Sequence, residues 1–193
     1  MKAHDGTQGL YAELHCLSNF SFLRGASHPA ELVRAAAELG YAGLALTDEC
    51  SVAGVVRAHT AVKDLPLKLI VGSELVCSAD GLKLVVLAEN RSAYASLCGL
   101  ISRARRAAPK GEYRLDRDDV AECLQAHGLL LWIPSSSAHD FDTGRWLQER
   151  FAGRLWLAVE LLNTGNDRHQ LQAARALGRE LAVPLVVAGN VHM

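Results

Sequence analysis

The stretch ELHCLSNFSFLRGAS, residues 13–27, opens with a short apolar run and is followed closely by a second such run, GLALTD, at 43–48. Between the two, Pro29 and Glu31 are typical of a helix start, and Gly40 is typical of a helix end. This order predicts a strand, a crossover helix and a parallel strand, the unit from which α/β folds are built.

Short apolar runs alternate with helical patterns along the rest of the chain. Six or seven strands are predicted, at 13–17, 43–48, 68–76, 82–88, 129–134, 154–161 and 184–190, with helices at 29–39, 51–62, 93–106, 117–127, 142–151 and 167–181. One departure from plain alternation is predicted at Asp80 and Gly81, which are typical of a tight turn and favour a local hairpin of the third and fourth strands. The fold class is therefore α/β with one hairpin.

Composition limits the classes of protein to consider. The chain has 193 residues, half of them hydrophobic, which is enough for one domain with a real core and at most two. A net charge of -1 does not indicate a polyanion partner, so any nucleic-acid contact would be local. Five scattered cysteines indicate reduced thiols and a cytoplasmic protein. We expect no signal peptide and no membrane span, and a flexible tail at residues 1–10.

Several polar side chains lie at predicted strand ends. In parallel α/β folds, functional groups gather at the carboxyl ends of strands, so these side chains are expected to share one site. The candidates are His15, Asp48, Glu74, Glu160, Asn190 and His192.

Six motifs in order carry a resemblance to a known family. They are LHCLS at 14–18, LTDE at 46–49, GSE at 72–74, the block at 80–102, VELLNTG at 159–165 and GNVHM at 189–193. In order and spacing they resemble the PHP (polymerase and histidinol phosphatase) domain that begins bacterial C-family DNA polymerases. The segments at 13–27, TDE and KGEYRL resemble the error-prone branch of the polymerase III alpha subunit. The resemblance covers essentially the whole chain and implies a distorted (β/α)7 TIM-like barrel.

An intact PHP site, as the family implies, holds up to three metals on His, Asp, Glu and Cys ligands. Such ligands suit borderline or hard divalent ions, which activate water against phosphodiesters. This chain departs from that pattern at five places, where Leu17, Arg24, Glu49, Lys83 and Asn190 stand in place of expected ligands. The family cysteine falls near 135–137, which are all serines. The resemblance therefore implies a vestigial site made of His15, Leu17, Arg24, Asp48, Glu49, Glu74, Lys83, Asn190 and His192.

Two function classes follow from the resemblance. The favoured one is a catalytically silent, metal-free structural module of an error-prone DNA polymerase without proofreading, in which Arg24 and Lys83 supply positive charge in place of metals. The alternative is an active phosphoesterase or 3′-5′ exonuclease with zinc or manganese on His15, Glu74 and His192. We expect the chain to be the N-terminal piece of a longer polymerase, with the final barrel helix and the polymerase modules outside it. Magnesium would then serve the polymerase domain.

Some residues have simpler interpretations. Asp48 is equally suited to cap the following helix, Lys83 is otherwise a solvated lysine at a hairpin edge, and Glu160 is otherwise paired with a neighbouring arginine. Ser135–Ser137 lack the Gly-x-Ser-x-Gly surroundings of a serine nucleophile.

A basic segment is the best local candidate for DNA contact. It contains Arg103, Arg105, Arg106, Lys110 and Arg114, with Tyr113 available for stacking. The competing interpretation is a solvated helix end, because basic side chains also stabilise helix C-termini. Expected partners are the polymerase domain of the same chain, DNA through that chain, and other mutagenesis or replication proteins, with no membrane.

Overall fold

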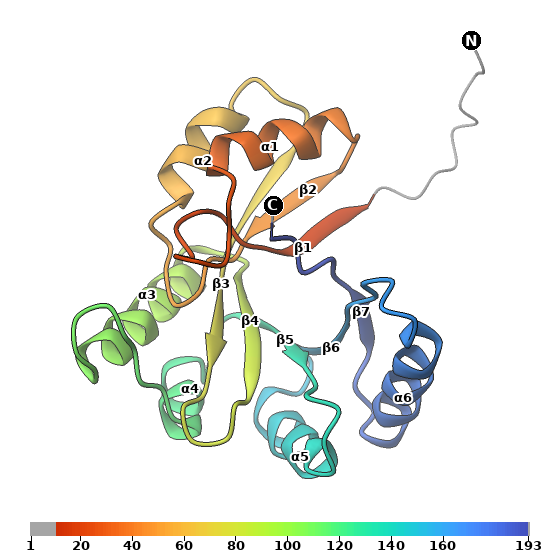
Figure 1. Ribbon diagram of the computed structural model, residues 1–193. Helices are drawn as coiled ribbons and strands as arrows, with labels where there is room; N and C mark the ends of the chain where they lie inside the picture. The colour runs from red at the N-terminus through yellow and green to blue at the C-terminus, as the bar shows by residue number, and fades with distance from the viewer. Residues whose placement is uncertain (1–10, 193) are drawn as a thin grey trace.

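The computed structural model describes residues 11–192, and the tail predicted at residues 1–10 lies outside this range. Its centre is one sheet of seven strands in the order β1 to β7 (Figure 1). The strands are β1 (Ala12–Cys16), β2 (Gly43–Leu46), β3 (Lys68–Val76), β4 (Lys83–Ala88), β5 (Leu129–Ile133), β6 (Leu155–Val159) and β7 (Leu185–Val187). The sheet curls into a half-barrel, so the predicted α/β barrel class is confirmed.

The β3–β4 hairpin predicted at Asp80 and Gly81 is present. Strands β1 to β3 are parallel, β4 is antiparallel to both β3 and β5, and β5 to β7 are parallel again. Gly81 adopts φ 70°, a backbone conformation that glycine reaches without steric cost. Because β4 runs backwards, its first residue, Lys83, pairs with Val76 at the end of β3.

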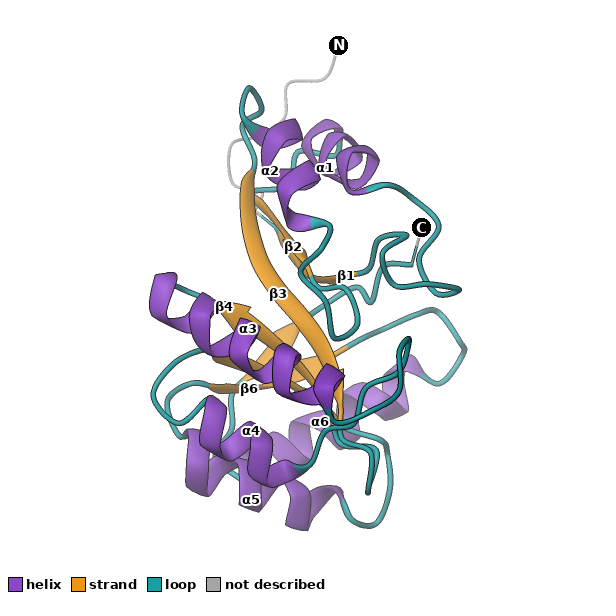
Figure 2. Cartoon of the chain, turned by 90° about the vertical axis from the view of Figure 1, so that its left-hand side faces the viewer, coloured by secondary structure: helices purple, strands orange, loops and turns teal. Residues whose placement is uncertain are grey.

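Six helices cover the convex side of the sheet (Figure 2). They are α1 (Pro29–Glu38), α2 (Val55–Val62), α3 (Arg91–Arg106), α4 (Arg117–Cys123), α5 (Asp140–Phe151) and α6 (Asp167–Glu180). Helices α1 and α2 pack over β1 and β2 around one apolar cluster, and the other four pack around a larger one that includes the buried Trp132. None of the helices within 11–192 is long and apolar enough to cross a membrane.

A third, smaller cluster fills the concave side of the sheet. Val85 of β4, Leu131 of β5 and Ala158 of β6 are buried there. Since side chains alternate between the two faces of a strand, residues two positions away from these also point inward. The concave face therefore holds the side chains that form the candidate site.

The segment after β7 connects the two edges of the curled sheet by an isolated bridge between Cys16 and Val191. Leu17 N donates to Val191 O and Val191 N donates to His15 O, both at 2.9 Å. The buried Glu13 carboxylate adds a link by accepting the backbone N–H of Gly189 at 2.8 Å. The start and the end of the described chain are thus held together at the site.

Candidate functional site

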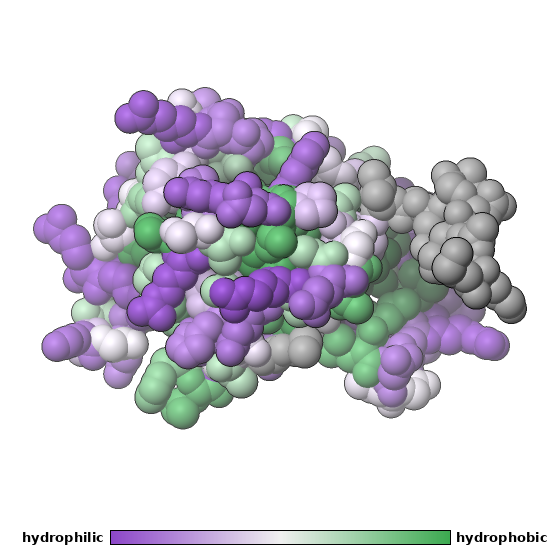
Figure 3. All heavy atoms as spheres, turned by 90° about the horizontal axis from the view of Figure 1, so that it is seen from above, coloured by the Kyte–Doolittle hydropathy of each residue, from purple (hydrophilic) through white to green (hydrophobic). Residues whose placement is uncertain are grey.

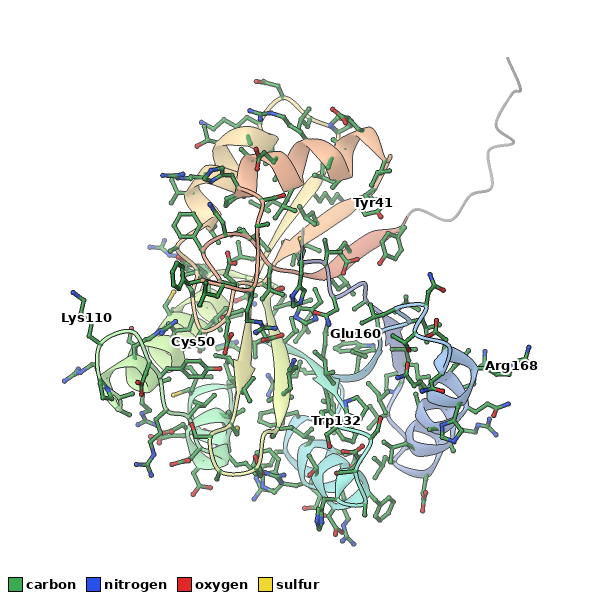
Figure 4. The ribbon with its side chains drawn as sticks, in the orientation of Figure 1. Tyr41, Cys50, Lys110, Trp132, Glu160 and Arg168 are labelled. Atoms are coloured by element: carbon green, nitrogen blue, oxygen red, sulfur yellow. The ribbon has the colours of Figure 1, made fainter. Side chains whose placement is uncertain are left out.

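Three charged side chains reach the concave face from β3, β4 and the end of β6, because each lies two residues from, or pairs with, an inward-facing residue. Glu74 on β3 pairs with the inward-facing Val85, and Lys83 lies two residues before Val85 on β4. Glu160, labelled near the centre of Figure 4, follows β6 two residues after the inward-facing Ala158. Alternation along three strands therefore brings two carboxylates and one ammonium group to the same end of the half-barrel.

His15 lies between two of these carboxylates. Its Nδ1 is 2.6 Å from Glu160 Oε1, its Nε2 is 2.9 Å from Glu74 Oε2, and its side chain is fully buried. The pairing of β1 with β2 is irregular between Glu13 and Cys16, and His15 lies within this irregularity. Such irregularities re-aim side chains near functional sites. Both ring nitrogens of His15 are engaged, so neither presents a free lone pair.

Arg24, from the loop between β1 and α1, joins Glu74 to a third carboxylate at the site, that of Glu49. Its guanidinium contacts Glu49 at 2.6 Å and binds Glu74 through both terminal nitrogens, with Nη2 at 3.2 Å from Oε2. Lys83 Nζ lies 3.6 Å from the same Glu74 oxygen. Lys83 thus faces the carboxylates, which does not support its interpretation as an ordinary solvated lysine.

Charge is balanced within this group of six side chains, which we call the ion-pair cluster: His15, Arg24, Glu49, Glu74, Lys83 and Glu160. Three carboxylates face Arg24, Lys83 and, when protonated, His15. Glu74 is at the centre, with contacts to all three cationic groups and no solvent exposure. A buried carboxylate is tolerated only with such partners.

The environment shifts two pKa values in directions that keep the cluster charged. Burial alone would raise the pKa of Glu74, but hydrogen bonds from His15 and Arg24 hold it at about 2. Burial alone would lower the pKa of His15, but hydrogen bonds to Glu160 and Glu74 raise it above its usual 6.5. Glu74 is therefore ionised and His15 protonated around pH 6 in the folded state.

These shifts predict that stability depends on pH in two limbs. The contribution of Glu74, on the order of 3 kcal/mol, is complete above its unfolded pKa of 4.5 and is lost as the pH falls toward 2. The contribution of His15 is complete below 6.5 and is lost as the pH rises through its raised folded pKa. Denaturant unfolding across pH should therefore give maximal stability between 4.5 and 6.5.

A matched pair of variants assigns the alkaline limb. His15→Gln should remove it, whereas His59→Gln, at an exposed position on α2, should leave it in place. An alkaline limb that persists in His15→Gln would show that another group titrates.

Asp48 organises the loop instead of capping a helix. Its carboxylate accepts the backbone N–H of Ser18 at 2.8 Å, the Ser18 hydroxyl at 2.8 Å and the Ser21 hydroxyl at 2.7 Å, all buried. Helix α2 begins later, at Val55, with Gly54 as its N-cap. The capping interpretation of Asp48 is therefore wrong, because its oxygens are used to hold the loop that presents Arg24.

Three other predicted positions contribute no metal-ligand geometry. Leu17 is fully buried, and its side chain has no donor atom. His192 is exposed, and its Nε2 is 2.6 Å from Asn190 Oδ1. Within residues 11–192, no three His, Cys, Asp or Glu side chains are grouped so that they could hold a metal ion.

Tyr113 was missed as a partner of the cluster. Its hydroxyl donates to Glu49 Oε1 at 2.8 Å. The pKa of Tyr113 is raised, mainly by burial and also by the nearby negative charge of Glu49. The ring lies under Arg105, whose guanidinium also donates to the backbone oxygens of Glu49 and Cys50 at 3.2 Å. Tyr113 is thus occupied by contacts within the domain. From the sequence it was a candidate only for stacking on nucleic acid and part of the family-like segment KGEYRL, and neither observation indicates its bond to Glu49.

The predicted basic segment is divided between paired and exposed side chains. Arg105 packs on Tyr113, and Arg103 pairs with Asp119 and Glu122. The remaining three, Arg106, Lys110 and Arg114, are exposed, and Figure 4 shows Lys110 pointing away from the molecule.

The serines at 135–137 are bound to the start of α5. Ser135 Oγ donates to Asp140 Oδ1 at 2.9 Å, and Ser137 N donates to Asp140 Oδ2 at 3.2 Å. These contacts satisfy the Asp140 carboxylate at the first residue of α5.

Solved structures of other proteins have a similar fold. A proposed metal-dependent phosphoesterase from Bifidobacterium adolescentis superposes with a TM-score of 0.70 at 15% identity, covering 96% of this chain and 89% of that one. An amidohydrolase from Chromobacterium violaceum, solved with sulfate and no metal, gives a TM-score of 0.64 at 14% identity and covers 94% of this chain and 87% of that one. At these identities the likeness concerns the fold alone.

The fold and the motifs define a PHP domain. The family model for the PHP domain matches residues 13–154, and the chain belongs to this family. More specifically, it is homologous to the N-terminal region of error-prone DNA polymerases, as the resemblance predicted.

The similar polymerases are much longer than this chain. The error-prone DNA polymerase of Dechloromonas aromatica is 55% identical over 188 residues, which cover 95% of this chain and 18% of that protein. The corresponding polymerase of Methylococcus capsulatus is 52% identical over 186 residues, covering 96% and 18%. The chain therefore spans about a fifth of these relatives' length.

Proposed function

We propose that the chain is a metal-free structural PHP domain of an error-prone DNA polymerase, without proofreading activity. The observation that carries this proposal is the position of the Arg24 guanidinium, which joins Glu49 to the buried Glu74. Arg24 and Lys83 place two cationic groups next to the carboxylate that a metal would need, and like charges this close repel a divalent ion.

The alternative zinc or manganese site on His15, Glu74 and His192 fits the residues less well. His15 has both ring nitrogens bonded to carboxylates, and Glu74 is bonded to His15 and Arg24. His192 contacts Asn190 instead. A metal would have to break these contacts and displace Arg24, and its binding would leave the guanidinium without its buried partner.

The proposal extends to the longer polymerase chain. There the domain would support DNA-directed nucleotide transfer during damage-induced synthesis in the cytoplasm, with magnesium at the catalytic carboxylates of the polymerase part. Arg106, Lys110 and Arg114 remain candidates for contact with DNA, because their side chains are exposed. The nucleotide-transfer activity itself would lie in the part of the relatives that this chain does not span.

The test is a combined metal and turnover measurement on the purified chain. After incubation with zinc or manganese and dialysis, elemental analysis is expected to find far less than one metal per chain. A single-stranded oligonucleotide and a chromogenic phosphate ester should not be hydrolysed above the protein-free rate. Turnover that His15→Ala and Glu74→Ala both abolish, with exposed His59→Ala as the active control, would overturn the proposal.

A further inference from the structure

The loop between β1 and α1 carries two large hydrophobic side chains in solvent. Phe22 is 84% exposed and Leu23 is 90% exposed, the highest values among large hydrophobic residues in the range 11–192. We call these two residues the loop apex. Figure 1 shows the loop in dark red between the α1–α2 pair and α3, and the space-filling view in Figure 3 shows hydrophobic atoms projecting at the lower edge of the molecule.

The loop that carries the apex is held in place by side-chain contacts on both sides of Phe22 and Leu23. Asp48 binds the hydroxyls of Ser18 and Ser21, and Arg24 is fixed by the ion-pair cluster. Gly25 N donates to Ser21 O at 3.0 Å, and a Cβ at Gly25 would lie 2.1 Å from Ser18 O, so only glycine fits this turn. The apex is thus presented on an ordered base, which reduces the entropy lost when it binds a partner.

Leu23 adopts a backbone conformation that is unfavourable for leucine. Its φ is 62°, in the left-handed region where glycine and asparagine are accommodated more easily. Burial elsewhere in the domain does not offset this cost, because the side chain is 90% exposed. A leucine that is both strained and exposed has no stabilising role inside the domain, so its role is expected in a contact outside it.

The size of the apex indicates what kind of partner it fits. The Phe22 side chain offers on the order of 200 Å² and the smaller Leu23 side chain offers less, whereas a stable complex of separate molecules buries about 800 Å² per partner. Such a small contact is sufficient when the partner is covalently linked, because linkage gives an effective concentration in the millimolar range. The chain spans only 18% of its polymerase relatives, so such a linked partner is present in those proteins.

We propose that Phe22 and Leu23 dock into an apolar groove on the polymerase region of the same, longer chain. This inference rests on the proposed function, because it requires that region. Arg24 follows Leu23 directly, so the ion-pair cluster that holds Arg24 also fixes the position of the docking residues. The cluster would then serve as the anchor of an interdomain contact.

The experiment uses the full-length polymerase chain with a benzophenone amino acid at position 22. Irradiation followed by peptide mass spectrometry should yield crosslinks within one chain, to a peptide of the polymerase region. The same probe at Leu39, which is 68% exposed after α1, is the matched control and should give several-fold fewer such crosslinks. Phe22→Ser is a second variant and should make the full-length chain more sensitive to proteolysis between the domain and the polymerase region.

Two results would overturn the docking proposal. One is crosslinking at position 22 no greater than at Leu39, and the other is crosslinking mainly between two copies of the chain at rising protein concentration. Primer extension by the same probe-bearing protein reports separately on the polymerase assignment. A protein that extends primers but gives no crosslink would refute the docking alone, whereas one that does not extend primers would refute the proposed function.

Discussion

Glu74→Ala is expected to lower the free energy of unfolding by about 3–5 kcal/mol, since removing one partner of a buried ion pair strands the other charges. Glu74 is the shared partner of His15, Arg24 and Lys83, and it is fully buried. Without Glu74, His15 keeps its contact with Glu160 and Arg24 keeps its contact with Glu49. Lys83 loses the carboxylate with which it pairs. Urea or guanidinium unfolding measures the change.

The matched control for this substitution is Glu38→Ala, which removes the same side chain from an exposed position on α1. It should change stability by no more than about 0.5 kcal/mol. A loss below about 1 kcal/mol in Glu74→Ala would contradict the central role of Glu74 in the ion-pair cluster.

Removing the two cations is expected to give the site an affinity for divalent metal. In the double variant Arg24→Gln with Lys83→Gln, His15 is the one cationic side chain that the ion-pair cluster of the described residues keeps beside Glu49, Glu74 and Glu160. The net negative charge that remains should attract zinc, which has ligands of suitable type there. At a hundredfold excess over its Kd, zinc would stabilise the variant by about 2.7 kcal/mol.

The melting temperature, determined with and without zinc, measures this stabilisation. The unmodified chain should not shift, and neither should a control variant with Arg34→Gln and Lys63→Gln, which removes two positive charges outside the ion-pair cluster. If zinc stabilises the unmodified chain as much as the double variant, then Arg24 and Lys83 do not exclude metal.

Much of the fold could be predicted from local sequence pattern. Strand β3 was predicted at its observed bounds, because the segment KLIVGSELV is rich in apolar, β-branched residues and has the length of a strand. Strand β7 was predicted at 184–190 but ends at Val187, since the chain then turns to pair Val191 with β1. Helix α2 begins four residues later than predicted, because Ser51, in the loop before it, donates its backbone N–H to Ser73 Oγ of β3. Both differences arise from contacts that are distant in sequence.

The residues of the site could be predicted from the sequence, but the contacts between their side chains could not. The resemblance pointed to Arg24, Glu74 and Lys83 as one group, and the structure brings them together. The contact of His15 with Glu160 joins residues 145 positions apart, and no local pattern contains it. The alternative in which Glu160 pairs with a neighbouring arginine is wrong, because its observed ion-pair partner is His15 of the first strand.

Closure of the sheet has a consequence for how the domain folds. Cys16 pairs with Val191, so the strand made first meets its last neighbour only after almost all of the described chain has been synthesised. Contacts this distant in sequence are slow to form, because a long loop must close first. During synthesis, Glu13 lacks the Gly189 N–H that it later binds, and His15 lacks Glu160. Burial of these polar groups must therefore be a late step, and the ion-pair cluster would lock a barrel that has already formed.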